Sequence, residues 1–145
     1  MKRIPLKELA LNTFLPYGTY TSLSDPQGIK IGDEPIEFFR DLIQVNLGVN
    51  NSVSLSSCRI FKRPPIIDVT ECHSSCGEGL LPLDGDIAIH VGTATPNGEV
   101  PLDRIEAFVI PKGTFVSLRP GVWHHAPFTM GGKPVNVLVV LPERT

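Results

Sequence analysis

The feature that most constrains the fold is a succession of short β-prone runs from Val45 onward. Runs rich in Val, Ile, Thr and Phe alternate with turn residues such as Pro64-Pro65, Asp84-Gly85 and Pro111-Lys112-Gly113. We predict strands near 52–59, 65–73, 86–92, 105–110, 114–118 and 135–141. A parallel βαβ fold would need helical patterns of about 10–15 residues between strands, and the sequence has none. The pattern therefore predicts an antiparallel β-sandwich or barrel.

The N-terminal third of the sequence carries weaker patterns. Residues 6–14 place apolar side chains at helical spacing, and the turn at 16–18 ends this segment. Residues 21–33 are rich in Gly, Ser, Asp and Pro, and we predict a loop there. Residues 34–42 predict a second short helix, with Asp33 as its N-cap and Pro35 in its first turn. We thus expect one all-β domain over residues 1–145, with one or two short N-terminal helices.

Composition narrows the class of protein. The chain has 145 residues, of which 41% are hydrophobic, and a formal net charge of -2. This length is enough for one domain with a buried core, and the charge gives no electrostatic basis for binding nucleic acid or an anionic membrane. No apolar run reaches membrane-spanning length, and the basic N-terminus lacks the apolar core of a signal peptide. We therefore expect a cytoplasmic protein without nucleic-acid or membrane partners.

The cysteines offer one alternative metal site. Cys58, Cys72 and Cys76 make an odd number, which favours reduced thiols in a chain without an export signal. Cys72 and Cys76 flank His73, so a zinc site is one interpretation. A structural zinc site usually takes four ligands from paired Cys/His clusters, and the sequence holds only one such cluster. Free thiols in the core or on the surface are the better interpretation.

Metal-ligand residue types gather in two separate stretches, ECHSSCGEGLLPLDG at 71–85 and PGVWHHAPF at 120–128. On a strand over 65–73, Glu71 and His73 would share one face, and a short turn would return Glu78 to the same region. His124 would join them from a neighbouring strand. This mixture of carboxylates and imidazoles suits Mn, Fe, Ni or Zn. Three or four protein ligands can leave one position open for water or substrate.

These two stretches resemble the two cupin motifs. Glu71-x-His73-x4-Glu78-x6-Gly85 looks like the first motif, with an acid where the first histidine usually stands. Residues 113–124 look like the second motif, in which Gly121 and His124 match and Arg119 replaces the motif proline. The resemblance implies a cupin-type double-stranded β-helix, which is a jelly-roll-like barrel.

A closer resemblance is to the ureidoglycolate lyase family of cupins. FLPYG at 14–18 is similar to the family's F-x-P-Y-G, and ECH at 71–73 with LLPL at 80–83 is similar to its E-R-H and F-I-P-L. GVWHHAP at 121–127 is similar to its V-W-H-H-P, with one additional Ala. The family tends to have Gln where this chain has Glu78, which makes the present site more acidic. The similarity extends over residues from about 8 to 141.

The resemblance implies an enzyme that splits ureidoglycolate into glyoxylate and urea. We expect Glu71, His73 and His124 to be catalytic, and the same residues with Glu78 to hold a divalent metal. No organic cofactor is implied, and cupins commonly form homodimers. The same site could serve a related small hydroxy acid. The alternatives are a metal-binding cupin that isomerises sugars or sugar acids, and a non-catalytic domain that binds a small ligand.

Four further residues are candidates for substrate contacts. Arg59 and Arg119 could each bind a carboxylate through the planar guanidinium group or form a surface ion pair. Trp123 is either a pocket wall or part of the core. His125 is expected on the opposite strand face from its neighbour, as a hydrogen-bonded support or as a direct contact. His90 lies within an apolar run, and we interpret it as structural.

Overall fold

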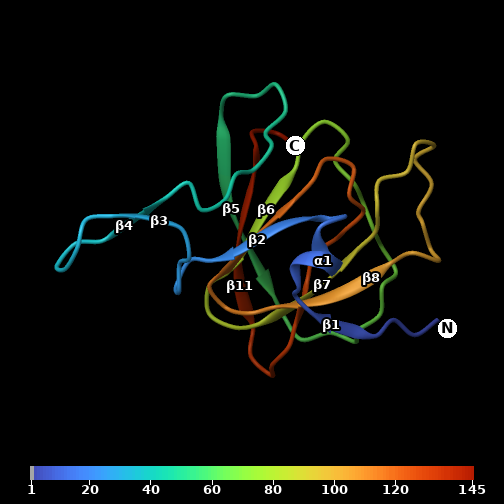
Figure 1. Cartoon of the computed structure of the whole chain (residues 1–145). Helices are drawn as coiled ribbons and strands as arrows, with labels where there is room; N and C mark the ends of the chain where they lie inside the picture. The colour runs from blue at the N-terminus through green and yellow to red at the C-terminus, as the bar shows by residue number, and fades with distance from the viewer. Residues whose placement is uncertain (1) are drawn as a thin grey trace.

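The computed structural model describes residues 2–145 and consists almost entirely of β-structure (Figure 1). Its elements are β1 (Leu6–Glu8), α1 (Leu11–Phe14), β2 (Gly18–Ser22), β3 (Ile29–Ile31), β4 (Phe38–Arg40), β5 (Val53–Ile60), β6 (Glu78–Pro82), β7 (Ile87–Val91), β8 (Glu106–Ile110), β9 (Thr114–Leu118), β10 (Phe128–Thr129) and β11 (Val135–Pro142). Within residues 2–145, no helix is long and apolar enough to span a membrane.

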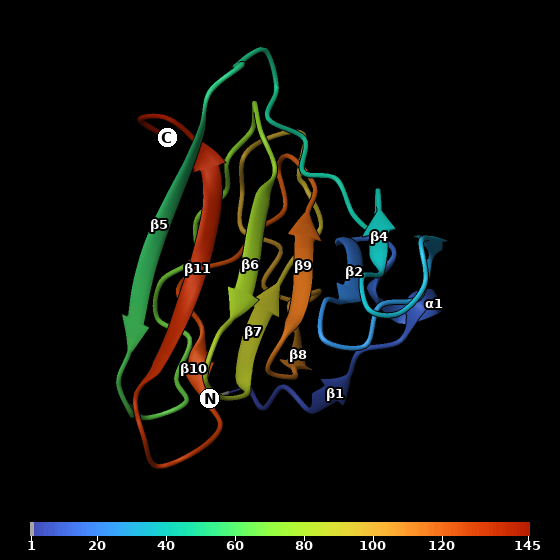
Figure 2. The same ribbon diagram turned by 90° about the vertical axis from the view of Figure 1, so that its left-hand side faces the viewer.

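Two sheets form the body of the protein. The larger has the strand order β2-β9-β6-β11-β5, and the smaller has the order β1-β8-β7-β10. Neighbouring strands pair in antiparallel fashion except β1 and β8, which are parallel. Figure 2 shows the five-stranded sheet lying in front of the strands of the four-stranded sheet. The all-β prediction is confirmed.

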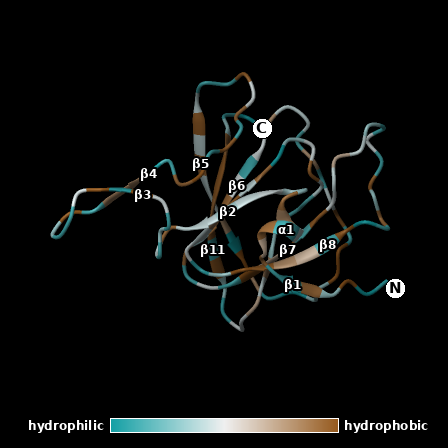
Figure 3. Ribbon diagram, viewed as in Figure 1, coloured by the Kyte–Doolittle hydropathy of each residue, from teal (hydrophilic) through white to brown (hydrophobic). Residues whose placement is uncertain are grey.

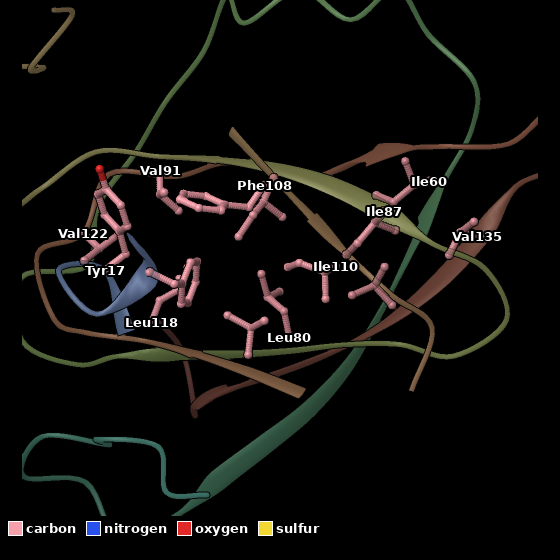
Figure 4. Close-up of a cluster of buried hydrophobic side chains, with 14 residues drawn as sticks. Tyr17, Ile60, Leu80, Ile87, Val91, Phe108, Ile110, Leu118, Val122 and Val135 are labelled. Carbon is pink, nitrogen blue, oxygen red and sulfur yellow. The ribbon is translucent and has the colours of Figure 1, made fainter. Parts of the chain in front are cut away.

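The core lies between these two layers. Alternate residues of each strand face inward, so that β7 contributes Ile87, Ile89 and Val91 while Ala88 and His90 face the other way. Figure 4 shows the inward-facing side chains of both layers pointing toward one another. At one end of the core, the rings of Phe14 and Phe108 meet edge to face with centroids 5.2 Å apart, a favourable aromatic geometry.

Five of the six predicted strands are confirmed. The runs at 52–59, 86–92, 105–110, 114–118 and 135–141 correspond to β5, β7, β8, β9 and β11, and each boundary agrees within one residue. These runs carry β-branched residues and end at strong turn signals. Local sequence and tertiary structure therefore favour the same conformation there.

The strand predicted at 65–73 is wrong. This segment has no ladder, and only Glu71 forms an isolated bridge, with His124. Pro64 and Pro65 lack the backbone N–H that a central strand must donate, and the side chain of Val69 is half exposed. The strand of this region is β6, which begins at Glu78 and was not predicted.

The helix predicted at 34–42 is also wrong. Residues 38–40 form β4, which pairs with β3 inside the segment predicted to be a loop. Ile31 lies opposite Phe38, and such aromatic–β-branched pairs stabilise a hairpin. Figure 1 shows this hairpin projecting from the body of the protein.

The predicted helix over 6–14 is correct only in its second half. Residues 6–8 form β1, which adds to the edge of the four-stranded sheet, and helix α1 follows it. Sheet pairing with β8 outweighs the helical spacing of these residues. Strand β2 was missed because it overlaps the start of the predicted loop at 21–33.

Candidate active site

The site begins with a buried carboxylate at the start of β6. Glu78 is the first residue of β6 and alternates with Leu80, which lies in the core. The Glu78 side chain therefore enters the space between the two sheets, and the residue is 8% exposed. A buried carboxylate is unfavourable unless charged or hydrogen-bonding partners compensate it.

Two imidazoles supply these partners. Nε2 of His124 lies 3.0 Å from Oε2 of Glu78, and Nε2 of His73 lies 3.2 Å from the same oxygen. The two rings are neighbours, with centroids 5.3 Å apart. The fold thus brings His73, Glu78 and His124 together from segments that lie up to 51 positions apart (124 minus 73).

A hydrogen bond from Nδ1 fixes the ring orientation of His124. Nδ1 lies 2.8 Å from the carbonyl oxygen of Val122, which can only accept, so Nδ1 carries a proton. Nε2 is then the atom that faces Glu78. Burial lowers the pKa of His124, but the hydrogen bond and the charge of Glu78, with the Val122 carbonyl, outweigh it, and the net pKa is raised. When both ring nitrogens donate, His124 is an imidazolium paired with the Glu78 carboxylate.

Glu71 lies at the more exposed edge of the same cluster. The backbones of Glu71 and His124 exchange two hydrogen bonds of 2.7 and 2.8 Å across their isolated bridge. Oε1 of Glu71 also lies 3.2 Å from Nδ1 of His125. The sequence predicted His125 on the opposite strand face from His124, as a hydrogen-bonded support or a direct contact, and its ring lies beside Glu71. Residues 123 and 124 form only isolated bridges, so regular strand alternation does not continue through this segment.

The donor set fits a divalent metal. Glu71, His73 and His124 each offer one ligand atom, and these atoms lie within 4.8 Å of one another. Ligand atoms about 2.0–2.2 Å from one metal lie at most about 4.4 Å apart, so a metal would draw these three atoms slightly closer together than they are here. Glu78 already contacts both imidazoles and could complete the set.

Three of the candidate substrate residues lie outside this cluster. Arg59 is exposed on β5, and its Nε donates to Oδ1 of Asn136 at 2.9 Å. The indole of Trp123 is buried and donates to Oγ1 of Thr95 at 3.0 Å. Arg119 is exposed after β9 and lines a cavity of about 540 Å³ beside residues 44–46.

Two further residues lie beside the cluster: Thr70, which the sequence did not indicate, and His90, which it indicated as structural. Oγ1 of Thr70 lies 3.2 Å from the carbonyl oxygen of His124 and 3.2 Å from Nε2 of His90. His90 is 2% exposed. Burial lowers the pKa of His90 to about 4, and the charges of His124, His125 and Arg63 add to this effect. Thr70 gave no signal in the sequence beyond its place before Glu71.

Comparison with known proteins places the chain in a family. A family model described as ureidoglycolate lyase matches residues 1–145. The chain belongs to the ureidoglycolate lyase family. A ureidoglycolate lyase from Rhodobacter capsulatus is 25% identical to this member over 126 residues, which cover 86% of this chain and 77% of the relative.

One solved structure bears on the fold of this family member. A dTDP sugar isomerase from Desulfovibrio desulfuricans G20 matches with a TM-score of 0.54 and 13% identity, over 90% of this chain and 82% of that one. Oxalate decarboxylase from Bacillus subtilis matches with a TM-score of 0.46 and 12% identity, over 64% of this chain and 22% of that one. The cupin-type fold expected from the sequence is confirmed.

Proposed function

We propose that this protein is a ureidoglycolate lyase that splits ureidoglycolate into glyoxylate and urea. The observation that carries the proposal is the buried carboxylate of Glu78 between the Nε2 atoms of His73 and His124. In a member of this family, that arrangement supplies groups that exchange protons at a protected position. General acid–base catalysis of this kind contributes about 10²–10⁴-fold to a rate.

The reaction moves one proton from oxygen to nitrogen and breaks the C–N bond between them. A base removes the proton of the substrate hydroxyl, and the electrons of that O–H bond form the new carbonyl of glyoxylate. The C–N bond breaks, and the departing nitrogen takes up a proton to give urea. Glu71 stands at the exposed edge, where it can accept the hydroxyl proton, and His73 or His124 can supply the proton to nitrogen.

The same donor set has a second use. Glu71, His73, Glu78 and His124 would hold Zn, Mn, Fe or Ni, and a bound metal would stabilise negative charge on the substrate oxygen. His124 would bind through Nε2, because the Val122 carbonyl keeps its Nδ1 protonated. We propose His125, Trp123, Arg119 and Arg59 as substrate contacts, and His125 has the strongest support because it touches Glu71.

Turnover of purified protein tests the function. Protein treated with a chelator is assayed for glyoxylate and urea, alone and after addition of each of the four metals. We expect both products in equal amounts under at least one condition. Metal analysis of wild type, His124→Ala and Arg59→Ala tests the ligand set, with loss of metal expected only for His124→Ala. Absence of turnover under every condition would remove ureidoglycolate as the substrate.

The His124→Ala variant also separates a catalytic role of the site from a role in binding alone. If His124→Ala binds a small hydroxy acid as tightly as wild type, and no reaction of the wild type is detected, the protein is a binding domain rather than a lyase. If wild type turns over another hydroxy acid or isomerises a sugar acid, the acid–histidine site keeps its role and the substrate assignment changes.

We propose that the protein forms a homodimer, and the β3–β4 hairpin supports this. Ile29, Ile31 and Phe38 lie on one face of the hairpin and are 58%, 49% and 60% exposed. Figure 3 shows hydrophobic positions along this projecting segment. An isolated two-stranded hairpin is marginally stable in water, so a second copy that covers this face would stabilise it.

Size-exclusion chromatography with light scattering measures the molar mass of the protein and thus its oligomeric state. We expect a dimer for wild type and a monomer for Ile31→Glu. Val49→Glu is the matched control, because Val49 is an exposed apolar residue outside the hairpin. A monomeric wild type would contradict the proposal.

We also propose a cytoplasmic location. Cys58, Cys72 and Cys76 are all free thiols in the structure, which suits a reducing compartment. Thiol titration of protein isolated from cells under non-reducing conditions should count three thiols. A count below three that a reductant restores would contradict the proposal.

A further inference from the structure

A hydroxyl beside the site joins three separate segments of the chain. Thr70 precedes Glu71, and its Oγ1 lies 3.2 Å from the carbonyl oxygen of His124 and 3.2 Å from Nε2 of His90. His90 belongs to β7, which lies in the interior of the four-stranded sheet between β8 and β10. Neither Thr70 nor His90 belongs to the cluster that holds the candidate catalytic groups.

The partners of Thr70 fix the direction of both hydrogen bonds. The His124 carbonyl can only accept, so the hydroxyl of Thr70 donates to it. Oγ1 then accepts from His90, which must carry its proton on Nε2. Nδ1 of His90 has no partner within residues 2–145 and carries a lone pair. With the proton on Nδ1 instead, His90 would bury an N–H donor that has no acceptor, which is unfavourable.

This bond lies in the middle of an irregular segment whose two ends are held separately, by Arg63 donating to the carbonyl of Ala126 and by the N–H of Gly77 donating to the carbonyl of Asn46. Residues 61–77 contain no strand, and Glu71 makes only an isolated bridge with His124. Two backbone hydrogen bonds join Glu71 to His124, and one of 2.7 Å joins the N–H of Gly121 to the carbonyl of His73. The carbonyl oxygen of His124 accepts the backbone N–H of Glu71, and the side chain of Thr70 donates to this same oxygen.

We propose that Thr70 and His90 form a positioning pair that ties the irregular segment carrying Glu71 and His73 to strand β7. The pair holds the carbonyl of His124 and thereby sets the spacing between Glu71 and His124. Thr70 acts through the carbonyl of His124 and His90 acts through the hydroxyl of Thr70, so both are positioning residues and do not contact the reacting atoms. The kinetic part of this inference rests on the proposed lyase function.

Matched threonine variants test the pair. Thr70→Val keeps the shape of the side chain and removes the hydroxyl, and Thr70→Ser keeps the hydroxyl. We expect Thr70→Val to lower kcat about 10- to 100-fold, because small displacements of positioned groups have effects of this size, while KM changes less. Thr70→Ser should stay close to wild type. A Thr70→Val variant with wild-type kcat would overturn the proposal.

A second threonine provides the control. Thr129 ends β10, and its hydroxyl lies 3.2 and 3.1 Å from the carbonyl oxygens of Gly131 and Lys133 and donates its one proton between them, so Thr129→Val removes a hydrogen bond of the same kind away from the cluster. We expect it to keep full activity. Equal losses of kcat in Thr129→Val and Thr70→Val would mean that any such bond affects the enzyme through stability alone, which contradicts a positioning role.

Histidine variants and spectra keep the test decisive if Thr70→Val fails to fold. The amide of His90→Gln can donate to Thr70, whereas His90→Leu cannot, so Gln should retain more kcat than Leu. The ¹⁵N spectrum of wild type should show His90 with its proton on Nε2, and a proton on Nδ1 would overturn the pair.

Hydrogen exchange separates this inference from the lyase proposal. The amides of Glu71 and His124 donate the bonds of the isolated bridge. They should exchange faster in His90→Leu than in wild type whatever the substrate is. Unchanged exchange would contradict the pair even if ureidoglycolate is turned over, and faster exchange would support it even if ureidoglycolate is not.

Discussion

The two ends of β6 each present a carboxylate, in opposite surroundings. Glu78 at the start is 8% exposed and lies between two imidazoles. Asp84, just beyond the end, is exposed and accepts the backbone N–H of Asn136 at 2.8 Å and its side-chain amide. Imidazoles exchange protons near neutral pH and amides do not. The difference shows that burial and titratable partners, rather than a carboxylate alone, mark the site.

The electrostatics of the two ends differ in the same way. Hydrogen bonds from Asn136 lower the pKa of Asp84, with a smaller contribution from the charges of Lys112 and Arg59. At the other end, burial lowers the pKa of His124, and Glu78 outweighs it to give a net rise. The start of β6 thus holds a coupled acid–base pair, whereas the opposite end holds a solvated, structural carboxylate.

The largest contrast is expected in activity. His124→Ala removes one of the two partners of Glu78 and should lower kcat/KM about 10²–10⁴-fold, the range of a general acid or base. Asp84→Asn changes the carboxylate at the opposite end and should leave kcat/KM unchanged. Steady-state kinetics of both variants against wild type make the comparison. Similar losses in both would mean that the two ends are not functionally distinct.

A smaller effect is expected in the free energy of unfolding at low pH, through His90 beside the site. The folded pKa of His90 is about 4, below the ordinary value of 6.5. The unfolded chain therefore binds a proton that the folded chain does not, and stability is lost as pH falls from 6.5 through 4. This loss reaches roughly 3 kcal/mol.

Denaturant unfolding between pH 7 and pH 4 measures this contribution. His90→Gln cannot be protonated, so its free energy of unfolding should fall less over this range than that of wild type. Parallel losses in the two proteins would show that His90 does not stay neutral in the folded state.

The smallest effect is expected at Asp84. Its folded pKa is lowered, so the stability that it contributes is present above the unfolded value of 3.8 and is lost as pH falls through the folded pKa. Asp84→Asn should therefore be slightly less stable than wild type at pH 7, and the difference should narrow at a pH well below 3.8. Denaturant unfolding at both pH values checks this, and a larger loss at low pH would contradict the assignment.

Sequence predicted well the parts of the fold in which local pattern and tertiary pairing agree. Strands β7, β9 and β11 combine β-branched residues with clear turns at their ends. The prediction failed at 65–73 because Pro64 and Pro65 interrupt an otherwise β-prone run, and at 34–42 because pairing with β3 outweighs helical signals. Neither outcome follows from local propensity alone.

The candidate site shows the same division. Sequence brought Glu71, His73, Glu78 and His124 together because their residue types and spacing form a recognisable pattern, and the structure places them in contact or close proximity. It could not place His125, whose contact with Glu71 depends on irregular backbone. It also could not reveal the contact between Thr70 and His90, since a single hydroxyl between a carbonyl and an imidazole leaves no repeating pattern in sequence.

The measurement that tests the account most directly is the rate of glyoxylate release by Glu78→Ala, assayed at a temperature where circular dichroism shows it to be folded. Removal of the carboxylate leaves His73 and His124 without their shared partner. The account predicts a rate at least about 100-fold below wild type. A folded Glu78→Ala protein that releases glyoxylate at the wild-type rate would contradict it.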